Sequence, residues 1–379
     1  MESLGGFGIN SILWEEREFL DGGKYYYSPA LGQIRLAPPP AMKGGILADE
    51  QGLGKTLEVL GLIVASLDEL KQEAGLARAI HAQGDLTPSH ATLIIVPPAL
   101  VSQWHTEVRK AVGDALIVQY FDPKTSAFVG EGSSLGDPDI VITTYAALQN
   151  NKSSRTLSSF SWGRIVLDEM QEIRSSTTKI AKNCDDLVCQ RRWMLSGTPL
   201  FDGIDDLCGE LQFLRLSPYA AGLEDGFFKF SISNHWLHHS LHGLETLRIL
   251  GLLILRRSKS MTIVETGQPL LGLKPLTVEF VPIAQDPSER ALYCFLESIV
   301  SRVLQGDKVK TTHASPTNCV VKLREMCISA VSCTVFCYRK EIIGFSYTFS
   351  TVINRYRFYW VAVWALIRNL ARCMDGWSC

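Results

Sequence analysis

The residues with the clearest chemistry lie in a short loop from Asp49 to Thr56. Gly52 and Gly54 let backbone amides curl around phosphate oxygens, and a helix that follows adds the positive end of its dipole. In this pattern Lys55 reaches the β and γ phosphates, and the Thr56 hydroxyl ligates Mg²⁺. Asp49 stands where the usual pattern has its first glycine. A turn that merely caps a helix is the alternative, but Gly-Lys-Thr after a buried strand favours binding of ATP and Mg²⁺ by Asp49, Gly52, Gly54, Lys55 and Thr56.

An acidic pair, Asp168 and Glu169, directly follows an apolar run. Near bound phosphates such a pair divides two tasks: Asp168 holds the metal, and Glu169 orients or deprotonates the attacking water. A lone Asp-Glu pair is usually a solvated loop, but a phosphate loop on a neighbouring strand favours catalysis. Lys55, Asp168 and Glu169 are therefore the predicted catalytic residues, and Thr56 and Asp168 the predicted metal ligands.

The elements that position these residues are short apolar runs separated by helical periods. Strands that alternate with helices predict an α/β fold with a central parallel sheet and helices on both faces. In such sheets ligands bind beyond the carboxyl ends of the strands, where the polar motifs fall here. The predicted strands are Gly45–Ala48, Leu93–Val96, Ile140–Thr143, Ile165–Leu167 and Trp193–Leu195.

Other stretches complete the predicted organisation. Residues 68–90 and 121–138 are polar and contain glycine, so both are predicted to be surface loops. The chain turns helical after Pro199, Leu276–Ile283 alternates like a strand, and an amphipathic helix passes through Ala291. Four segments are expected: a lead-in over residues 1–40, the ATP-binding lobe over 41–260, a linker with a strand and helices over 261–330, and an unassigned tail over 331–379.

The composition excludes some classes of protein. With 46% hydrophobic and 20% charged residues, the 379-residue chain has ample material for a globular core. Its net charge of −2 gives no global basic signature, so nucleic acid would have to bind a local patch. The ten cysteines, without a secretory signal, are expected to be reduced thiols. The most lipid-like stretch, Phe358–Ile367, is about half the length of a spanning helix, so no membrane anchor is expected.

Two clusters carry weaker signals. Arg256, Arg257 and Lys259 are basic, and a solvated face or helix end is favoured over contact with DNA phosphates. Four histidines include pairs at i, i+4 spacing, but no carboxylate completes a known metal motif, so a polar helix face is favoured. These histidines are His235, His238, His239 and His242.

Taken together, the motifs resemble the first RecA-like lobe of superfamily-two helicases, and more narrowly the Swi/Snf-type ATPases. Their order and spacing cover roughly residues 40–330. Gln171, where many relatives carry histidine, and the segment Glu15–Pro29 are most similar to the SHPRH branch, a group of ubiquitin ligases with a Swi/Snf-type motor. The motifs that carry the resemblance are Gly44–Thr56, Leu93–Trp104, Asp139–Tyr145, Asp168–Gln171, Arg192–Pro199 and Leu255–Lys259.

The resemblance implies a nuclear motor that tracks along double-stranded DNA and remodels chromatin proteins. It adds Gln171 to the nucleotide-binding residues. It also places several positions towards the DNA, where hydroxyls and amides hold phosphates without reading sequence. For Trp104 a place in the core is at least as consistent with its helix. The DNA-facing positions are Pro97, Gln103, Trp104, Thr143, Thr144 and Tyr145.

Several features of the family are not found in this sequence. No glutamine precedes Gln33 to grip adenine, and no second-lobe motif follows residue 260. Because a catalytic arginine contributes about 10³ to 10⁵ in rate in related NTPases, this lobe alone is expected to bind ATP and hydrolyse it very slowly. The match ends near Ala330, so the tail is interpreted as part of a truncated or misspliced gene model. Ubiquitin ligase activity would require regions that are missing.

Two functions are therefore open. The first is the ATP-binding lobe of a DNA-dependent ATPase or translocase in chromatin remodelling or DNA repair. The second is a nucleotide-binding or scaffold fragment of an SHPRH-like ubiquitin ligase that does not hydrolyse ATP. Only the first requires phosphate release that duplex DNA stimulates.

Overall fold

The computed structural model describes residues 6–304 apart from short gaps, together with Glu2, Val321, Arg324 and Cys327. By its contacts the chain divides into two units, Met1–Leu273 and Lys274–Cys379. The boundary predicted near residue 260 stays a prediction, and the predicted tail lies outside the described residues. The gaps are residues 81–84, 131–136, 201–202, 220–225, 239–240, 264, 270, 275–276 and 283.

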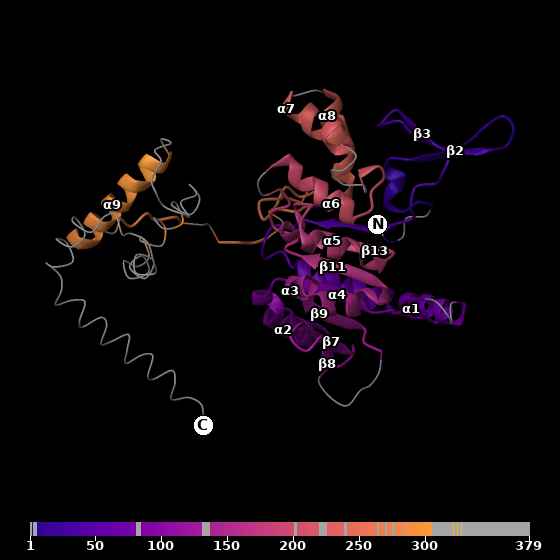
Figure 1. Cartoon of the computed structure of the whole chain (residues 1–379), viewed down its shortest axis with the longest axis horizontal. Helices are drawn as coiled ribbons and strands as arrows, with labels where there is room; N and C mark the ends of the chain where they lie inside the picture. The colour runs from indigo at the N-terminus through magenta and orange to yellow at the C-terminus, as the bar shows by residue number, and fades with distance from the viewer. Residues whose placement is uncertain are drawn as a thin grey trace. The chain divides into compact units, whose positions relative to one another are not determined.

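Within the described residues, the first unit contains an eight-stranded sheet of order β14-β4-β13-β11-β6-β9-β7-β8 (Figure 1). Neighbouring strands run parallel, apart from the antiparallel pair β7 and β8. The five predicted strands are confirmed, with ends within two residues. The strands are β4 (Lys43–Leu47), β6 (Thr92–Val96), β7 (Val118–Asp122), β8 (Ala127–Gly130), β9 (Ile140–Thr144), β11 (Arg164–Asp168), β13 (Arg191–Leu195) and β14 (Ile254–Leu255).

Helices cover both faces of this sheet (Figure 1). Ile94 of β6 packs in one core cluster with residues of α1 (Lys55–Ile80) and α2 (Val101–Val112), whereas its neighbours Leu93 and Ile95 pack in a second cluster. This alternation is that of a strand buried on both sides. The predicted α/β class is confirmed. The helices of the second cluster include α3 (Tyr145–Gln149), α4 (Asn151–Ser158), α5 (Lys179–Asp185) and α6 (Leu207–Phe213).

The N-terminal segment belongs to the core of the first unit. The 3₁₀ turn η1 (Ile9–Ile12) precedes the antiparallel strands β1 (Glu15–Glu18), β2 (Lys24–Ser28) and β3 (Gln33–Arg35), which stand apart from the central sheet (Figure 1). Trp14 is buried, and its indole Nε1 donates to the Ser217 carbonyl at 2.8 Å. These strands were not predicted from the sequence.

Two predicted loops, over residues 68–90 and 121–138, are wrong in part. Residues 68–80 continue α1, because Leu70 and Ala74 bury the same helix face as Ile63. Residues 121–130 end β7 and form β8, whose Phe128 packs edge-to-face on Phe121 with ring centroids 5.0 Å apart. The polar composition of both segments predicted loops, because their regular structure depends on tertiary packing rather than on local propensity.

The remaining helices are short except for one. Residues 277–282 are not a strand, so that prediction is wrong for the part of it that the structure describes. The amphipathic helix predicted through Ala291 is confirmed as α9 (Pro287–Leu304), in the second unit. The others are α7 (Asn234–Leu237) and α8 (Leu241–Leu250), the turns η2 (Pro98–Leu100), η3 (Met170–Ile173), η4 (Ile204–Asp206) and η7 (Gly251–Leu253), and the π-helical turn η6 (Lys229–Ser233).

Three short strands form a separate parallel sheet of order β12-β10-β5, and β10 directly precedes β11 of the central sheet. They are β5 (Thr87–Pro88), β10 (Phe160–Trp162) and β12 (Val188–Cys189). No helix among the described residues is long and apolar enough to cross a bilayer. The stretch Phe358–Ile367 lies outside those residues.

A buried carboxyl group lies on α6, which packs against η3. Glu210 is 1% exposed, and its Oε2 atom has no hydrogen-bond partner within the described part of the chain. Burial, and to a smaller extent the charge of Asp206, raises the pKa of Glu210 well above its ordinary value. The folded protein therefore holds this proton more tightly than the unfolded chain, and its stability falls as the pH rises from the ordinary carboxyl pKa through the raised one.

We expect Glu210→Gln to flatten this pH dependence. At about pH 8 the variant should melt about 2–4 °C above the wild type, which corresponds to about 1 kcal/mol, and the difference should shrink towards about pH 4. Thermal unfolding followed by circular dichroism measures it. The exposed Glu172, changed to Gln, is the control, and equal melting of wild type and Glu210→Gln at both pH values would contradict the argument.

Candidate nucleotide-binding site

The in-register pairing of three strands brings the predicted motifs to one edge of the sheet. Leu195, the last residue of β13, lies opposite Leu47 at the end of β4 on one side and opposite Asp168 at the end of β11 on the other. Beyond the strands, the Ser196 amide donates to the Leu47 carbonyl at 3.2 Å. The segments that follow β4, β13 and β11 therefore begin side by side.

The loop after β4 has the backbone of a phosphate cradle. Gly52 and Gly54 have φ angles of 87° and 89°, a region in which glycine is favoured, and α1 begins at Lys55. The Lys55 Nζ atom donates to the Asp49 carbonyl at 2.7 Å, so the lysine side chain folds over the loop. Thr56 follows in the first turn of α1. The amides at this helix end have no partner within the helix and can bind an anion.

Asp49 turns its carboxylate away from this cradle. The side chain is fully buried, and its Oδ1 and Oδ2 atoms accept from the backbone N and the Nε of Arg257 at 2.8 and 2.9 Å. The Nη2 atom of Arg257 also contacts Asp49 and Glu58. These hydrogen bonds, with Asp49 first, raise the pKa of Arg257. Asp49 therefore shapes the loop through an ion pair, and only its backbone faces Lys55.

Asp168 is held by two donors. It is 9% exposed, and its Oδ2 accepts from the Trp104 indole Nε1 at 2.6 Å while its Oδ1 accepts from the Glu169 amide at 3.0 Å. Burial raises the pKa of Asp168, whereas the Trp104 hydrogen bond and, more weakly, the charge of Lys55 lower it. The phosphate-loop lysine and the acidic pair are thus close enough to interact. The structure brings together the residues predicted to share one site.

Glu169 has a strained backbone. Its φ and ψ angles of 52° and 60° are left-handed, a conformation that costs a non-glycine residue about 1–3 kcal/mol and that clusters at functional sites. Its Oε2 accepts from the Gln171 Nε2 at 2.8 Å, and the Gln171 Oε1 accepts from the Ser196 hydroxyl at 3.3 Å. The Ser196 hydroxyl also accepts from the Thr198 amide at 3.0 Å. Gln171 therefore links the acidic pair to the turn after β13.

Most of the predicted DNA-facing side chains are buried. Trp104 of α2 lies in the hydrophobic core. The Thr143 hydroxyl donates to the Phe121 carbonyl at 3.2 Å, and the Tyr145 hydroxyl donates to the Asp168 carbonyl at 2.8 Å. Thr144 is also buried. The core place for Trp104 is therefore confirmed, and the buried side chains of the other three residues are not available to DNA phosphates. That these positions lie towards the DNA stays a prediction. Of the six positions, only Gln103 is exposed and Pro97 is partly so.

Only part of the histidine cluster lies in the described residues. His235 lies in α7 and His238 at its end, while His239 lies outside the described residues. Within the part of the chain that the structure covers, no group of three or more His, Cys, Asp or Glu side chains could hold a metal ion.

Sequence reasoning located the basic cluster after β14 but missed its contacts with the phosphate loop. Residues 256–259, here called the strap, lie along the phosphate loop. Arg256 donates through Nη1 to the carbonyls of Ala48 at 2.7 Å and Gly197 at 3.2 Å. Arg256 is exposed, as a solvated face predicts, although its guanidinium also holds these two carbonyls. For Arg257 the prediction is incomplete, because its side chain pairs with the buried Asp49. The motif was visible in the sequence, but its partner Asp49 lies 208 residues away, beyond any local pattern.

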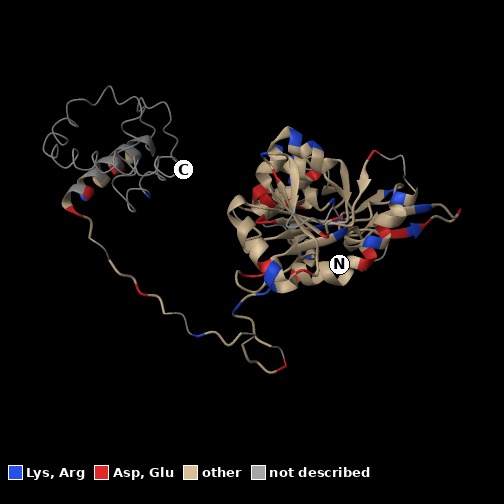
Figure 2. Ribbon diagram, turned by 90° about the horizontal axis from the view of Figure 1, so that it is seen from below, with Lys and Arg blue, Asp and Glu red and all other residues tan. Residues whose placement is uncertain are grey.

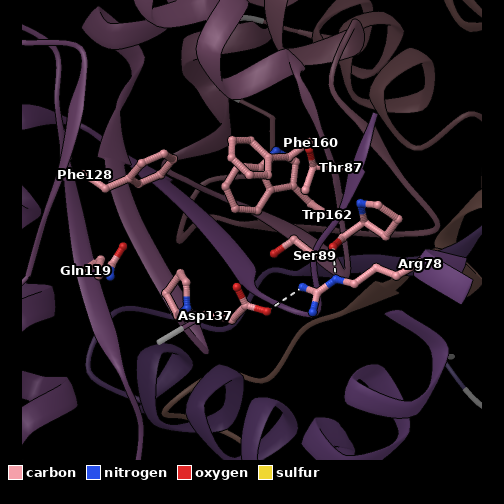
Figure 3. Close-up of a pocket in the computed structure, with 10 residues that line it drawn as sticks. Arg78, Thr87, Ser89, Gln119, Phe128, Asp137, Phe160 and Trp162 are labelled. Atoms are coloured by element: carbon pink, nitrogen blue, oxygen red, sulfur yellow. Dashed lines mark hydrogen bonds and ion pairs between the residues drawn. The ribbon is translucent and has the colours of Figure 1, made fainter. Parts of the chain in front are cut away.

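A pocket of about 120 Å³ lies at the opposite end of the sheet, away from the phosphate loop (Figure 3). Phe128, Phe160 and Trp162 line one side, and Arg78 pairs with Asp137 at 2.6 Å on the other. Trp162 precedes β11 and Asp137 precedes β9, so the pocket faces the amino ends of these strands. None of the predicted site residues lines it.

A parallel sheet with a Gly-Lys-Thr loop after β4 and an Asp-Glu pair after β11 defines a phosphate-loop NTPase lobe of the RecA-like type. A sequence model described as the SNF2-related domain matches residues 9–330. The chain therefore belongs to the SNF2-related family of helicase-like ATPases. The predicted family is confirmed.

The relatives include DNA repair proteins of fungi. The rad5 protein of Aspergillus fumigatus is 30% identical over 308 residues, which cover 75% of this chain and 24% of that protein. The rad8 protein of Schizosaccharomyces pombe is 30% identical over 335 residues, covering 82% and 29%. The chain thus spans about a quarter of the length of these relatives. Among solved structures, the Sulfolobus solfataricus SWI2/SNF2 ATPase core in complex with dsDNA is 27% identical with a TM-score of 0.45, covering 75% of this chain and 53% of that one.

The Trp104 hydrogen bond is testable by a change that keeps the aromatic packing. We expect Trp104→Phe to raise the Mg²⁺ concentration required for half-maximal ATP binding about three- to tenfold, because Asp168 loses a donor that fixes its carboxylate. Titration calorimetry at varied Mg²⁺ measures it. The control is Trp162→Phe, since that buried indole donates to the Leu157 carbonyl. An unchanged Mg²⁺ requirement in Trp104→Phe would show that the indole only packs.

Proposed function

We propose that this chain is the ATP-binding lobe of a Swi/Snf-type DNA-dependent ATPase that translocates on double-stranded DNA. The observation that carries the proposal is the convergence of the phosphate loop and the acidic pair at one sheet edge, where the charge of Lys55 acts on Asp168. Family membership supports ATP as the substrate.

The residues divide the chemistry as follows. The amides around Gly52 and Gly54 bind phosphate oxygens, and Lys55 leaves the Asp49 carbonyl to bind the outer phosphates. Thr56 and Asp168 would hold Mg²⁺, which neutralises charge on the phosphate oxygens when bound. Hard oxygen donors suit this ion. A carboxylate has about four acceptor positions, and the two donors that contact Asp168 leave room for a metal.

Glu169 is the proposed general base. It orients water at the terminal phosphate and accepts its proton. The left-handed backbone at Glu169 aims the side chain differently from an extended strand end, and Gln171 fixes one of its carboxylate oxygens. Because Gln171 also accepts a hydrogen bond from Ser196, a movement of the Glu169 side chain would change the position of Ser196.

Double-stranded DNA and chromatin proteins are the proposed partners, and the nucleus the proposed location. Support comes from the family and from relatives named as DNA repair proteins. Positive and negative residues are interspersed over the first unit in Figure 2, in keeping with the net charge of −2. DNA contact would therefore be local and depend on backbone amides and exposed groups such as Gln103 rather than on a wide basic face.

The alternative is a fragment that binds nucleotide without hydrolysing it. It is favoured by the length of the relatives, about three times that of this chain, because hydrolysis in such motors depends on a second lobe. Placement in the SHPRH branch, and any link to the ubiquitin machinery through regions beyond this sequence, belong to this alternative.

The first test concerns binding. We expect Lys55→Ala to weaken ATP binding at least about tenfold, because it removes the charge that holds the outer phosphates. Equilibrium titration with a fluorescent ATP analogue measures it. Lys43→Ala is the matched control, since Lys43 lies at the opposite end of β4 and pairs with Glu69 at 3.8 Å. Equal affinity of the wild type and Lys55→Ala for the ATP analogue would contradict the proposed nucleotide site.

The second test separates the two functions. We expect Glu169→Gln to retain ATP binding within about twofold, since an amide oxygen still accepts from Gln171, and to lower DNA-stimulated phosphate release about 10²-fold or more. Single-turnover phosphate release with and without duplex DNA measures it. Glu172→Gln, an exposed neighbour on η3, is the control. Release that neither DNA nor Glu169→Gln changes would support the fragment that does not hydrolyse ATP.

A further inference from the structure

The strap continues the pairing of β14 with β4 beyond the ends of both strands. The Ala48 amide donates to the Leu255 carbonyl at 2.7 Å, and the Glu50 amide to the Arg257 carbonyl at 3.0 Å. The Lys259 amide in turn donates to the Glu50 Oε2 at 2.8 Å. The strap is therefore hydrogen-bonded to the first residues of the phosphate loop and follows its path.

The Arg257 side chain fixes the strap against the phosphate loop. It contacts both the fully buried Asp49, at the start of the loop, and Glu58, in the first turn of α1. Charge-assisted hydrogen bonds are short and directional, and breaking this pair would leave a buried charge without a partner. The position of the residues that follow Arg257 is thus tied to the loop and to the helix that carries Lys55.

Lys259 is the residue that this arrangement places on the loop. Its Cε and Nζ atoms both lie 3.6 Å from the position that a β-carbon at Gly52 would take. The side chain is partly buried, and its ammonium group makes no hydrogen bond or ion pair with the residues that the structure describes. A partly buried cation without a counter-ion, next to a loop built to bind anions, is suited to a phosphate.

We propose that Lys259 is a second phosphate-contacting lysine, which binds the same triphosphate as Lys55 from beside Gly52. The inference rests on the proposed nucleotide site and adds a contact to it. Lys259 lies near the C-terminal end of the first unit, so this part of the chain would contact the nucleotide. The strap would then be held more firmly when ATP is bound, because the phosphate neutralises the lysine.

The experiment compares Lys259→Met, Lys259→Arg and Lys152→Met with wild type by titration of MgATP at low salt. Met removes the charge but keeps the length of the side chain, and the backbone bond to Glu50 does not depend on it. We expect Lys259→Met to bind MgATP about tenfold more weakly, which is the effect of one charge-assisted contact, and Lys259→Arg to bind within about threefold of wild type. Lys152 is exposed on α4, and its replacement should change nothing.

A second readout separates a phosphate contact from a structural role. We expect the affinity of Lys259→Met to fall less steeply with added salt than that of the wild type, while the melting temperatures without nucleotide stay within about 1 °C. Unchanged MgATP binding in Lys259→Met would overturn the inference, and so would an equal loss in Lys259→Arg. If Lys55→Ala abolishes binding and Lys259→Met does not, only the second lysine is refuted. If the wild type binds no ATP, the proposed function fails as well.

Discussion

The parallel register of β4, β13 and β11 is the constraint on which the candidate site depends. Because Leu47, Leu195 and Asp168 lie opposite one another, each chain segment leaves the sheet at the same edge. A shift of one residue in the pairing of β11 with β13 would turn Asp168 to the other face and separate it from Trp104. The apolar strands between helix layers fix that register, since every residue of β11 is buried. Core packing therefore sets the distance between the lysine and the acidic pair.

The ion pair between Asp49 and Arg257 adds a second constraint across the same edge. It explains why an aspartate can stand where the usual loop begins with glycine: the side chain points out of the cradle to the strap. Such an ion pair is a weak source of stability, but it fixes the position of both segments, because moving Arg257 away would leave the buried Asp49 carboxylate without its partner. The loop, the start of α1 and the chain after β14 consequently form one unit.

Much of this could be predicted from local pattern, and the remainder could not, for physical reasons. Continuous apolar runs located the five central strands, and Gly-Lys-Thr located the loop, because both signals lie within a few residues. The end of α1 at Ile80 depends on burial of Leu70 and Ala74, and β14 depends on a partner strand some 208 residues away. The same holds for Trp104, whose hydrogen bond to Asp168 joins two segments that sequence order separates. Long-range contacts decided β14 and the Trp104 hydrogen bond, whereas β8 and the strands β1 to β3 pair with near neighbours in the sequence, where polar residues obscured the strand pattern.

Two buried residues in the helices that follow β6 and β9 hold Asp168 in place. Trp104 lies in α2, directly after the turn that begins at Pro98, and Tyr145 begins α3, directly after β9. Both donate to Asp168, one to its carboxylate and one to its carbonyl. A ligand that shifted the exposed start of α2 would move the Trp104 donor, and with it the carboxylate proposed to bind the metal. The side chains that the family pattern places towards DNA would then act from inside the protein, by positioning Asp168 rather than by touching phosphate.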